Sequence, residues 1–165
     1  MTTQTRITLK KVRIAKNQSE ETLAYTADIY FDGEKVAYAR NDGCGGETLI
    51  NPFQNTFAAM KRADEFACSL PAETSHGITI DSSLAWVVYS LAYDEEVAQQ
   101  LKSRIKRGVM FIKGSAENPQ GPIYRLRVPR GRKVSEGLDV VRKLGYTPIN
   151  DLPFDVALRL YKELE

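Results

Sequence analysis

The chain has 165 residues, of which 42% are apolar and 27% are charged. A chain of this length can bury its own hydrophobic core, and this composition excludes a wholly disordered protein. No apolar run approaches the roughly 20 residues that a membrane-spanning helix needs, and residues 1–6 lack the apolar segment of a signal peptide. The two cysteines fit reduced thiols, so we expect a cytosolic protein that makes no contact with membranes.

The net charge of +2 hides a strong asymmetry along the chain. Residues 1–100 contain nine Lys and Arg against fourteen Asp and Glu, a net charge of −5, whereas residues 101–165 contain fourteen against seven, a net charge of +7. Such a chain can present a basic face although its total charge is small. The basic half is either a binding surface or an ordinary solvated surface, and the charge pattern leaves both open.

The first fifty residues read as an antiparallel β-meander. Residues 6–15 form a strand whose apolar positions change phase at Lys10 and Lys11, which predicts a bulge there. Residues 22–31 alternate between apolar and polar, as a half-buried strand does. Asp32 and Gly33 then predict a tight hairpin into a third strand at 36–39.

The middle of the chain reads as two helices. Asn51 and Pro52 fit a helix start, with Asn as the cap and Pro in the first turn, and Pro71 follows its end. A second helix starts after Asp81 or Ser82 and ends at Gly108, with a break expected near Asp94.

The last third reads as a hairpin followed by two short helices. Strands at 109–113 and 123–128 flank a loop around 118–121, and the helices cover 134–144 and 153–164. The expected fold is therefore a single α+β domain over residues 1–165. It comprises a meander at 1–50, a helical segment at 51–107 and a basic hairpin with helices at 108–165.

The most unusual segment is the loop that follows the third strand, made of Asn41, Asp42, Gly43, Cys44, Gly45 and Gly46. Its three glycines permit backbone torsions that other residues avoid. Successive amides in such a loop can form a nest that binds an anion, but a structural corner of the sheet uses the same residues. The segment lacks the spacing of a P-loop or of a dinucleotide-binding fingerprint.

A cysteine nucleophile at Cys44 would need a neighbouring base, and His76 is the sole histidine of the chain. Their separation in the sequence gives no support to such a pair. Cys68 fits a small residue packed into the core from its helix. Since no paired ligand spacing is present, we predict no metal site, no cofactor and no catalytic residue.

The basic residues of the second half are the better candidates for contact with a partner. The predicted binding residues are Lys102, Arg104, Lys106, Arg107, Lys113, Arg125, Arg127, Arg130, Arg132 and Lys133. The run from Arg130 to Lys133 contains Gly131 and is flexible enough to follow a phosphate backbone. A surface that serves only solubility is the alternative interpretation.

Residues 19–46, SEETLAYTADIYFDGEKVAYARNDGCGG, resemble a family of small proteins carried by bacteriophages and other mobile elements. The family's pattern is a strand, an Asp-Gly hairpin, a second strand and an Asn-Asp-Gly-x-Gly-Gly loop. Its variable position is often His, but this chain has Cys44 there, so no role of an imidazole carries over. The resemblance implies an accessory protein that blocks a host defence system, and it does not imply an enzyme.

Three functional hypotheses follow. The first is a non-catalytic accessory protein that binds and inhibits a host protein or ribonucleoprotein complex, in the manner of an anti-CRISPR protein, through its basic surface. The second is direct binding of DNA or RNA by the same residues. The third is a small enzyme that uses the glycine-rich loop. An exposed edge strand in the meander also leaves a homodimer open.

Overall fold

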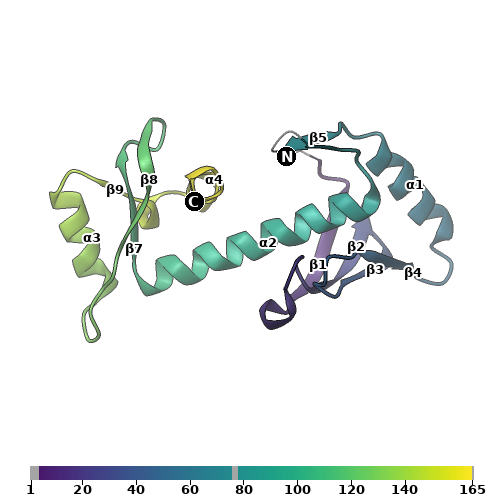
Figure 1. Cartoon of the computed structure of the whole chain (residues 1–165), viewed down its shortest axis with the longest axis horizontal. Helices are drawn as coiled ribbons and strands as arrows, with labels where there is room; N and C mark the ends of the chain where they lie inside the picture. The colour runs from purple at the N-terminus through teal and green to yellow at the C-terminus, as the bar shows by residue number, and fades with distance from the viewer. Residues whose placement is uncertain (1–3, 76–77, 165) are drawn as a thin grey trace. The chain divides into compact units, whose positions relative to one another are not determined.

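The computed structural model describes residues 4–75 and 78–164 and has the predicted α+β class (Figure 1). The chain divides into two compact units, unit 1 (Met1–Glu96) and unit 2 (Val97–Glu165), so the division falls inside the predicted segment 51–107. Residues 97–100 carry no charge, so the charge asymmetry follows the same boundary. Unit 1 has a net charge of −5 and unit 2 a net charge of +7.

Unit 1 contains an antiparallel sheet in the order β1-β2-β3-β4, and its second and third strands are followed by turns that the sequence predicts. The hairpin residues Asp32 and Gly33 have φ angles of 49° and 85°, as a tight turn of this type requires. The predicted bulge is confirmed: the register shifts between Lys10 and Arg13, where Lys11 has a φ of 53°. The strands are β1 (Ile7–Ile14), β2 (Tyr25–Phe31), β3 (Glu34–Asn41) and β4 (Leu49–Pro52), with a short 3-10 helix, Lys16–Gln18, after β1.

The predicted helix start at Asn51 and Pro52 is wrong, because both residues belong to β4. Asn51 pairs with Tyr38 of β3, and Pro52 is tolerated since β4 lies at the edge of the sheet. Helix α1 (Phe57–Cys68) starts later, after Thr56. The Thr56 hydroxyl lies 2.6 Å from the carbonyl oxygen of Val36, which fastens the start of the helix to β3.

Helix α1 packs on the sheet through three buried alanines, with Met60 and Phe66 partly buried beside them. Its buried residues are Ala59, Ala63 and Ala67, and small side chains of this kind allow a helix to lie close to a sheet. Phe57 is 68% exposed, and Cys68 is exposed as well. The prediction that Cys68 packs into the core is therefore wrong, because the alanine face is the one that meets the sheet.

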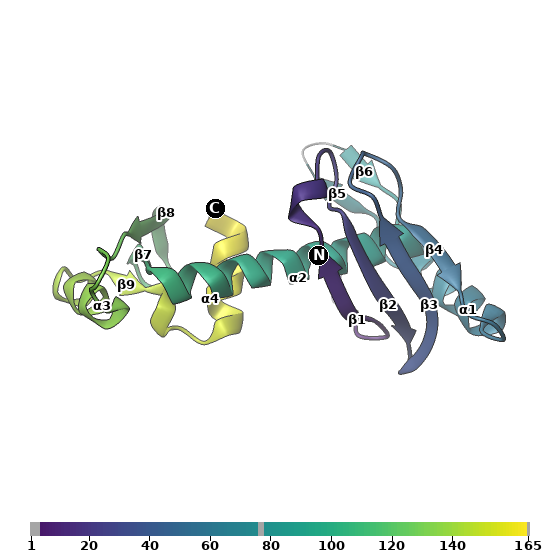
Figure 2. The same cartoon turned by 90° about the horizontal axis from the view of Figure 1, so that it is seen from below.

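Unit 1 also contains a short hairpin, β5 (Glu73–Ser75) and β6 (Ile78–Ile80), where the sequence suggests only a loop. His76 lies outside the described residues, so its proposed pairing with Cys44 stays a prediction. The first half of α2 (Leu84–Arg107) crosses behind the four strands and covers the same sheet face as α1 (Figure 2).

Helix α2 (Leu84–Arg107) runs for 24 residues without interruption, so the break predicted near Asp94 is wrong. Ser83 starts the helix in place of Asp81 or Ser82, because its hydroxyl accepts the amide of Trp86 at 3.1 Å. The predicted end is confirmed, since Gly108 follows the last helical residue. None of the helices in the described part of the chain combines the length and the apolar character that crossing a membrane requires.

Unit 2 contains an antiparallel sheet in the order β8-β7-β9 with a helix on each face (Figure 1). Met110 and Ile112 of β7 pack with Leu160 of α4 on one face, together with the second half of α2. On the other face, α3 brings Gly137 against Val109. The elements are β7 (Val109–Gly114), β8 (Pro119–Leu126), α3 (Val134–Lys143), β9 (Thr147–Pro148), a 3-10 helix at Ile149–Asp151 and α4 (Phe154–Leu164). The predicted hairpin and both predicted helices are confirmed, and β9 is an addition. The predicted loop around 118–121 is too long, because residues 119–121 belong to β8, and this strand ends at Leu126 instead of Val128.

One carboxylate is buried on the outer face of the unit 1 sheet. Asp28 of β2 is only 7% exposed, and its oxygen lies 3.0 Å from the Lys35 ammonium and 3.6 Å from that of Lys11. Burial disfavours the charged carboxylate, but the two ammonium groups together outweigh that effect and lower the pKa of Asp28 below its usual value. The bulge at Lys11 thus supplies part of the charge that this carboxylate needs.

We expect Asp28→Asn to lower the free energy of unfolding by about 1 kcal/mol at pH 7, because it removes charged hydrogen bonds. The native pKa is lowered, so the stabilisation exists above the unfolded pKa near about 4 and disappears as the pH falls through the native value. Urea unfolding at pH 7 and at acidic pH measures this difference. Asp64→Asn, at an exposed position of α1, is the control. An equal loss at both pH values would contradict the assignment.

Candidate functional site

The glycine-rich loop joins β3 to β4 and is held by the side chain of Asn41, which is buried. The Asn41 amide nitrogen donates to the carbonyl of Gly46 at 2.9 Å, and its oxygen accepts the amide of Gly43 at 2.9 Å. The same oxygen accepts the hydroxyl of Thr22 at 3.0 Å. A single asparagine therefore ties both ends of the loop to each other and to the turn that precedes β2.

Backbone groups of the glycine-rich loop form hydrogen bonds with other parts of unit 1. The carbonyl of Gly43 accepts the amides of Glu20, Glu21 and Thr22 at 3.0, 2.9 and 3.2 Å. The amide of Gly45 donates to the Thr22 hydroxyl at 3.3 Å. Two amides that an anion-binding nest would need, those of Gly43 and Gly45, already have partners. The geometry therefore favours a structural corner over an anion site.

The side chains of the loop point to the same conclusion. Asp42 is paired with Arg40 at 2.6 Å, and both side chains are more than half exposed. Cys44 is exposed, and its Sγ lies 3.8 Å from the carbonyl oxygen of Asp42. Among the described residues, no group of three His, Cys, Asp or Glu side chains is placed to hold a metal ion.

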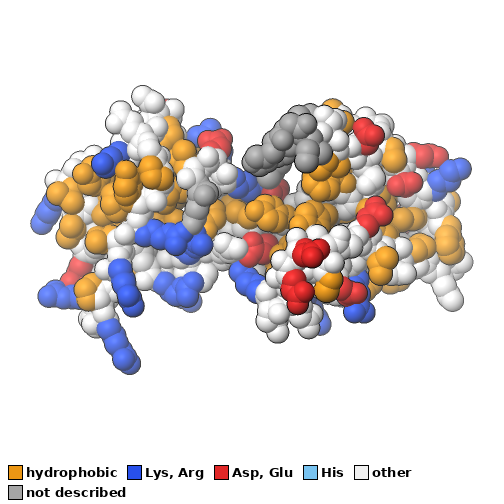
Figure 3. Space-filling model, viewed as in Figure 1, with side chains coloured by type: hydrophobic (Ala, Val, Ile, Leu, Met, Phe, Trp, Pro, Cys, Tyr) orange, Lys and Arg blue, Asp and Glu red, His pale blue; other side chains and the backbone are white. Residues whose placement is uncertain are grey.

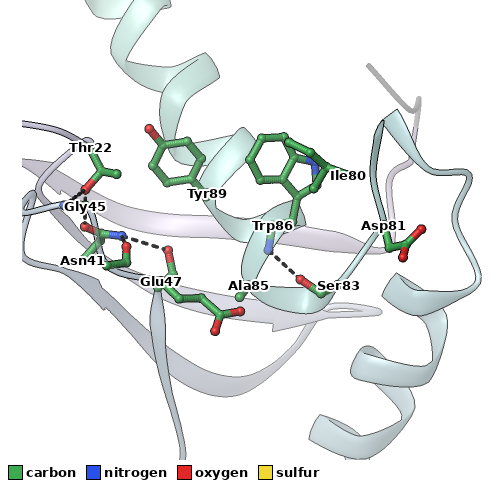
Figure 4. A pocket seen from close by; sticks show the side chains of 12 residues that line it. Thr22, Asn41, Gly45, Glu47, Ile80, Asp81, Ser83, Ala85, Trp86 and Tyr89 are labelled. Carbon is green, nitrogen blue, oxygen red and sulfur yellow. Dashed lines mark hydrogen bonds between the residues drawn. The ribbon is translucent and has the colours of Figure 1, made fainter. Parts of the chain in front are cut away.

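A cavity of about 550 Å³ lies between this loop and the start of α2 (Figure 4). The rings of Trp86 and Tyr89 form one wall, stacked with centroids 5.9 Å apart. The Trp86 Nε1 is buried and has no hydrogen-bond partner among the described residues. The described lining consists of Thr22, Asn41, Gly45, Gly46, Glu47, Thr48, Ile80, Asp81, Ser83, Ala85, Trp86 and Tyr89, and Cys44 lies outside it.

Tyr25 lies beside this cavity and is hydrogen-bonded to Thr48, with 2.9 Å between the hydroxyl oxygens. Burial raises the pKa of Tyr25 to about 12, although the bond to Thr48 partly opposes the shift. The phenol is therefore neutral at ordinary pH and cannot serve as a base. Among the described residues that line the cavity, no hydrogen bond joins a nucleophile to a base.

All ten predicted basic residues lie in unit 2, at three places. Lys106 and Arg107 end α2, next to the end of β8, because Val109 pairs with Leu126. Arg125 and Arg127 lie at that end of β8, and Arg130, Arg132 and Lys133 follow in the connection to α3. Lys102 and Arg104 lie over rings of α4 instead, at 5.1 Å from Phe154 and 5.3 Å from Tyr161. Figure 3 shows Lys and Arg side chains spread over the surface of this unit.

The basic residues differ in how firmly they are held. Arg132 is paired with Glu136 at 2.9 Å, and the Nε of Arg107 donates to the carbonyl of Ser103 at 3.1 Å. Lys106, Arg127 and Arg130 are exposed. These three side chains can reach a polyanion without giving up an interaction that the fold depends on.

The tenth residue, Lys113, lies apart from the others, near a row of aromatic rings that the sequence reasoning missed. Phe111 stacks on Tyr124 with centroids 5.5 Å apart and an angle of 22° between planes, and on Tyr146 at 5.3 Å and 16°. The Lys113 ammonium lies 5.1 Å from the centre of the Tyr124 ring. Tyr124 directly precedes Arg125 on a predicted strand, which was a local signal for that ring, but nothing local predicted its stacking with Phe111 or the contribution of Tyr146.

No family model, no curated protein and no solved structure matches this chain. The likeness of residues 19–46 to mobile-element proteins therefore stays a prediction carried by those residues alone. The chain itself offers two candidate features, which are the corner loop beside a cavity in unit 1 and the basic residues and row of aromatic rings in unit 2.

We expect Gly43→Ala to destabilise the protein by about 2 kcal/mol or more. Gly43 has a φ of 86°, and an added Cβ would overlap the carbonyl oxygen of Gln18 and lie 2.9 Å from the Cβ of Ala24. Gly46→Ala is the matched control in the same loop, because nothing lies within 4 Å of its added Cβ. Urea unfolding of both variants measures the difference, and equal stabilities would show that the corner does not depend on Gly43.

Proposed function

We propose that this chain is a nucleic-acid-binding protein and that unit 2 carries the binding surface. The observation that carries the proposal is the collection of the ten basic residues in one compact unit of net charge +7, which also holds a row of aromatic rings beside Lys113. Lysine and arginine side chains neutralise phosphates, and aromatic side chains stack on bases. Few other partners offer both kinds of group.

The charge of unit 1 supports the same assignment. Its net charge of −5 repels a polyanion, so contact with phosphates falls to unit 2.

A second candidate is the accessory protein that the likeness of residues 19–46 suggests. In that case unit 2 contacts a host nucleic-acid-handling complex, either its protein or its exposed nucleic acid, and inhibits it as an anti-CRISPR protein does. The two candidates use the same basic residues and differ in whether naked nucleic acid is bound.

An enzyme that uses the glycine-rich loop has less support. The amides of Gly43 and Gly45 already donate within the protein, and Cys44 lies outside the described lining of the neighbouring cavity. A binding role therefore fits the geometry better than a catalytic one does.

We expect the triple variant Lys106→Gln, Arg127→Gln and Arg130→Gln to weaken binding of a labelled single-stranded oligonucleotide. Each lost phosphate contact should reduce the slope of log K against log salt concentration by about 0.7 to 0.9. Fluorescence anisotropy over a salt series measures affinity and slope together. The control removes the same number of charges from exposed positions of unit 1, through Arg13→Gln, Lys61→Gln and Arg62→Gln, and should leave both unchanged.

One outcome would rule out direct binding, and a second would then support the accessory protein. If the wild-type protein binds no oligonucleotide at low salt, the first candidate is wrong. If affinity purification from host cells then recovers a nucleic-acid-handling complex with the wild type but not with the unit 2 triple variant, the second candidate takes its place.

A further inference from the structure

We infer that the row formed by Phe111, Tyr124 and Tyr146 is a stacking platform for the bases of a single-stranded nucleic acid. Because Phe111 lies between the two tyrosine rings, the bases stack at the two ends of the row, against Tyr124 and Tyr146. This inference rests on the proposed function and goes further, because it names the class of nucleic acid and the residues that select it. The row crosses unit 2's sheet: Phe111 on the central strand β7 pairs directly with Tyr124 on β8, and Tyr146 precedes β9.

The sheet geometry explains why the rings stand side by side. Neighbouring strands lie about 4.8 Å apart, and the ring centroids are 5.5 and 5.3 Å apart with nearly parallel planes. Because side chains alternate along β7, Met110 and Ile112 fill the core on one face while Phe111 stands on the other. The aromatic row therefore uses no side chain that the core between β7 and α4 needs.

Part of that face is left open. Helix α3 covers the end of the hairpin near Val109 and Val128, where its Gly137 makes close contact. Phe111, Tyr124 and Tyr146 lie farther along and are each only partly buried. Hydrophobic side chains reach the surface over β8 and β9 in Figure 3. An apolar row that remains partly exposed is a common mark of a binding surface.

Lys113 gives the row its charge. Its ammonium lies over the Tyr124 ring at 5.1 Å, where it can contact a phosphate while the bases lie against the rings. The other basic residues contribute to the net charge of +7, through which unit 2 attracts a polyanion. Aromatic rings alone would suit many apolar partners, but rings beside a lysine in a unit of net charge +7 are complementary to bases joined by phosphates.

Single strands fit this platform better than duplexes do. In a duplex the base faces are already stacked on each other, so side chains on a flat sheet cannot reach them. The bases of a single strand can separate and stack on aromatic rings with little regard to sequence. RNA and single-stranded DNA share this chemistry, and parallel titrations with oligouridylate and oligothymidylate of about 12 nucleotides distinguish them.

The test replaces Tyr124 in two ways. Tyr124→Leu keeps apolar bulk but removes the aromatic face, whereas Tyr124→Phe keeps the face. We expect Tyr124→Leu to weaken single-strand binding by about tenfold with an unchanged salt slope, and Tyr124→Phe to bind like the wild type. Tyr146→Leu should behave like Tyr124→Leu. A duplex of equal length should bind the wild type and Tyr124→Leu equally.

An abasic single strand provides the second measurement and needs no variant. It presents phosphates without bases, so the wild type should bind it about as weakly as Tyr124→Leu binds the normal strand. Thermal unfolding monitored by circular dichroism checks that the variants fold. Should Tyr124→Leu fail to fold, the abasic strand still decides.

The outcomes separate this inference from the proposed function. If the leucine variants and the abasic strand behave like the wild type and a normal strand, while the basic triple variant still loses affinity, unit 2 binds nucleic acid by charge alone and the platform is wrong. Complete absence of binding by the wild type would overturn both. A change in sedimented mass caused by Tyr124→Leu, without a change in affinity, would assign the row to contact between copies of the chain.

Discussion

Burial of the apolar stripe of α2 is the interaction on which both units depend. Leu84 and Val88 of its first half belong to the core of unit 1, and Leu101 of its second half belongs to the core of unit 2. Each buried side chain of this size contributes about 1.5 to 3 kcal/mol. Where the apolar stripe changes core, Glu96 is buried and paired with Lys16 at 2.9 Å. Each half of the helix therefore completes a different core.

The same boundary separates the charges. Because residues 97–100 are uncharged, the change in charge along the sequence coincides with the boundary between the units. Unit 1 has the acidic excess and unit 2 has the basic excess. Attraction between exposed charges falls off within about 10 Å at moderate salt, so each unit meets a partner mainly with its own charge. This separation lets a chain of nearly neutral total charge carry a surface suited to a polyanion, and it explains why composition alone leaves the question of a partner open.

The sequence predicted those parts of the fold whose signals are local. Alternation, the Asp32 and Gly33 turn and the bulge at Lys11 depend on neighbouring residues, and all three are confirmed. The helix start predicted at Asn51 and Pro52 was wrong, because a helix start and the end of an edge strand accept the same residues. The pairing of these residues with β3, which is not local, decides between the two structures. The basic residues of the candidate interface follow from composition, but the aromatic row depends on Tyr146, which joins it through the pairing of β9 with β7 across more than thirty residues.

The recognisable segment and the segment suited to binding are thus different parts of the molecule. The glycine-rich loop is distinctive because the chain must turn sharply there: Gly43 has a positive φ, and its carbonyl accepts three amides. Because the amides of Gly43 and Gly45 and the carbonyl of Gly43 already have partners in the protein, few backbone groups of the loop remain for a ligand. Unit 2 has the opposite character, with long cationic side chains at the surface and aromatic rings that the core does not need. The motif is conspicuous in the sequence because its backbone torsions require glycine, and it marks a corner of the fold. The proposed binding residues are of ordinary types, and it is the sheet of unit 2 that brings the three aromatic rings together.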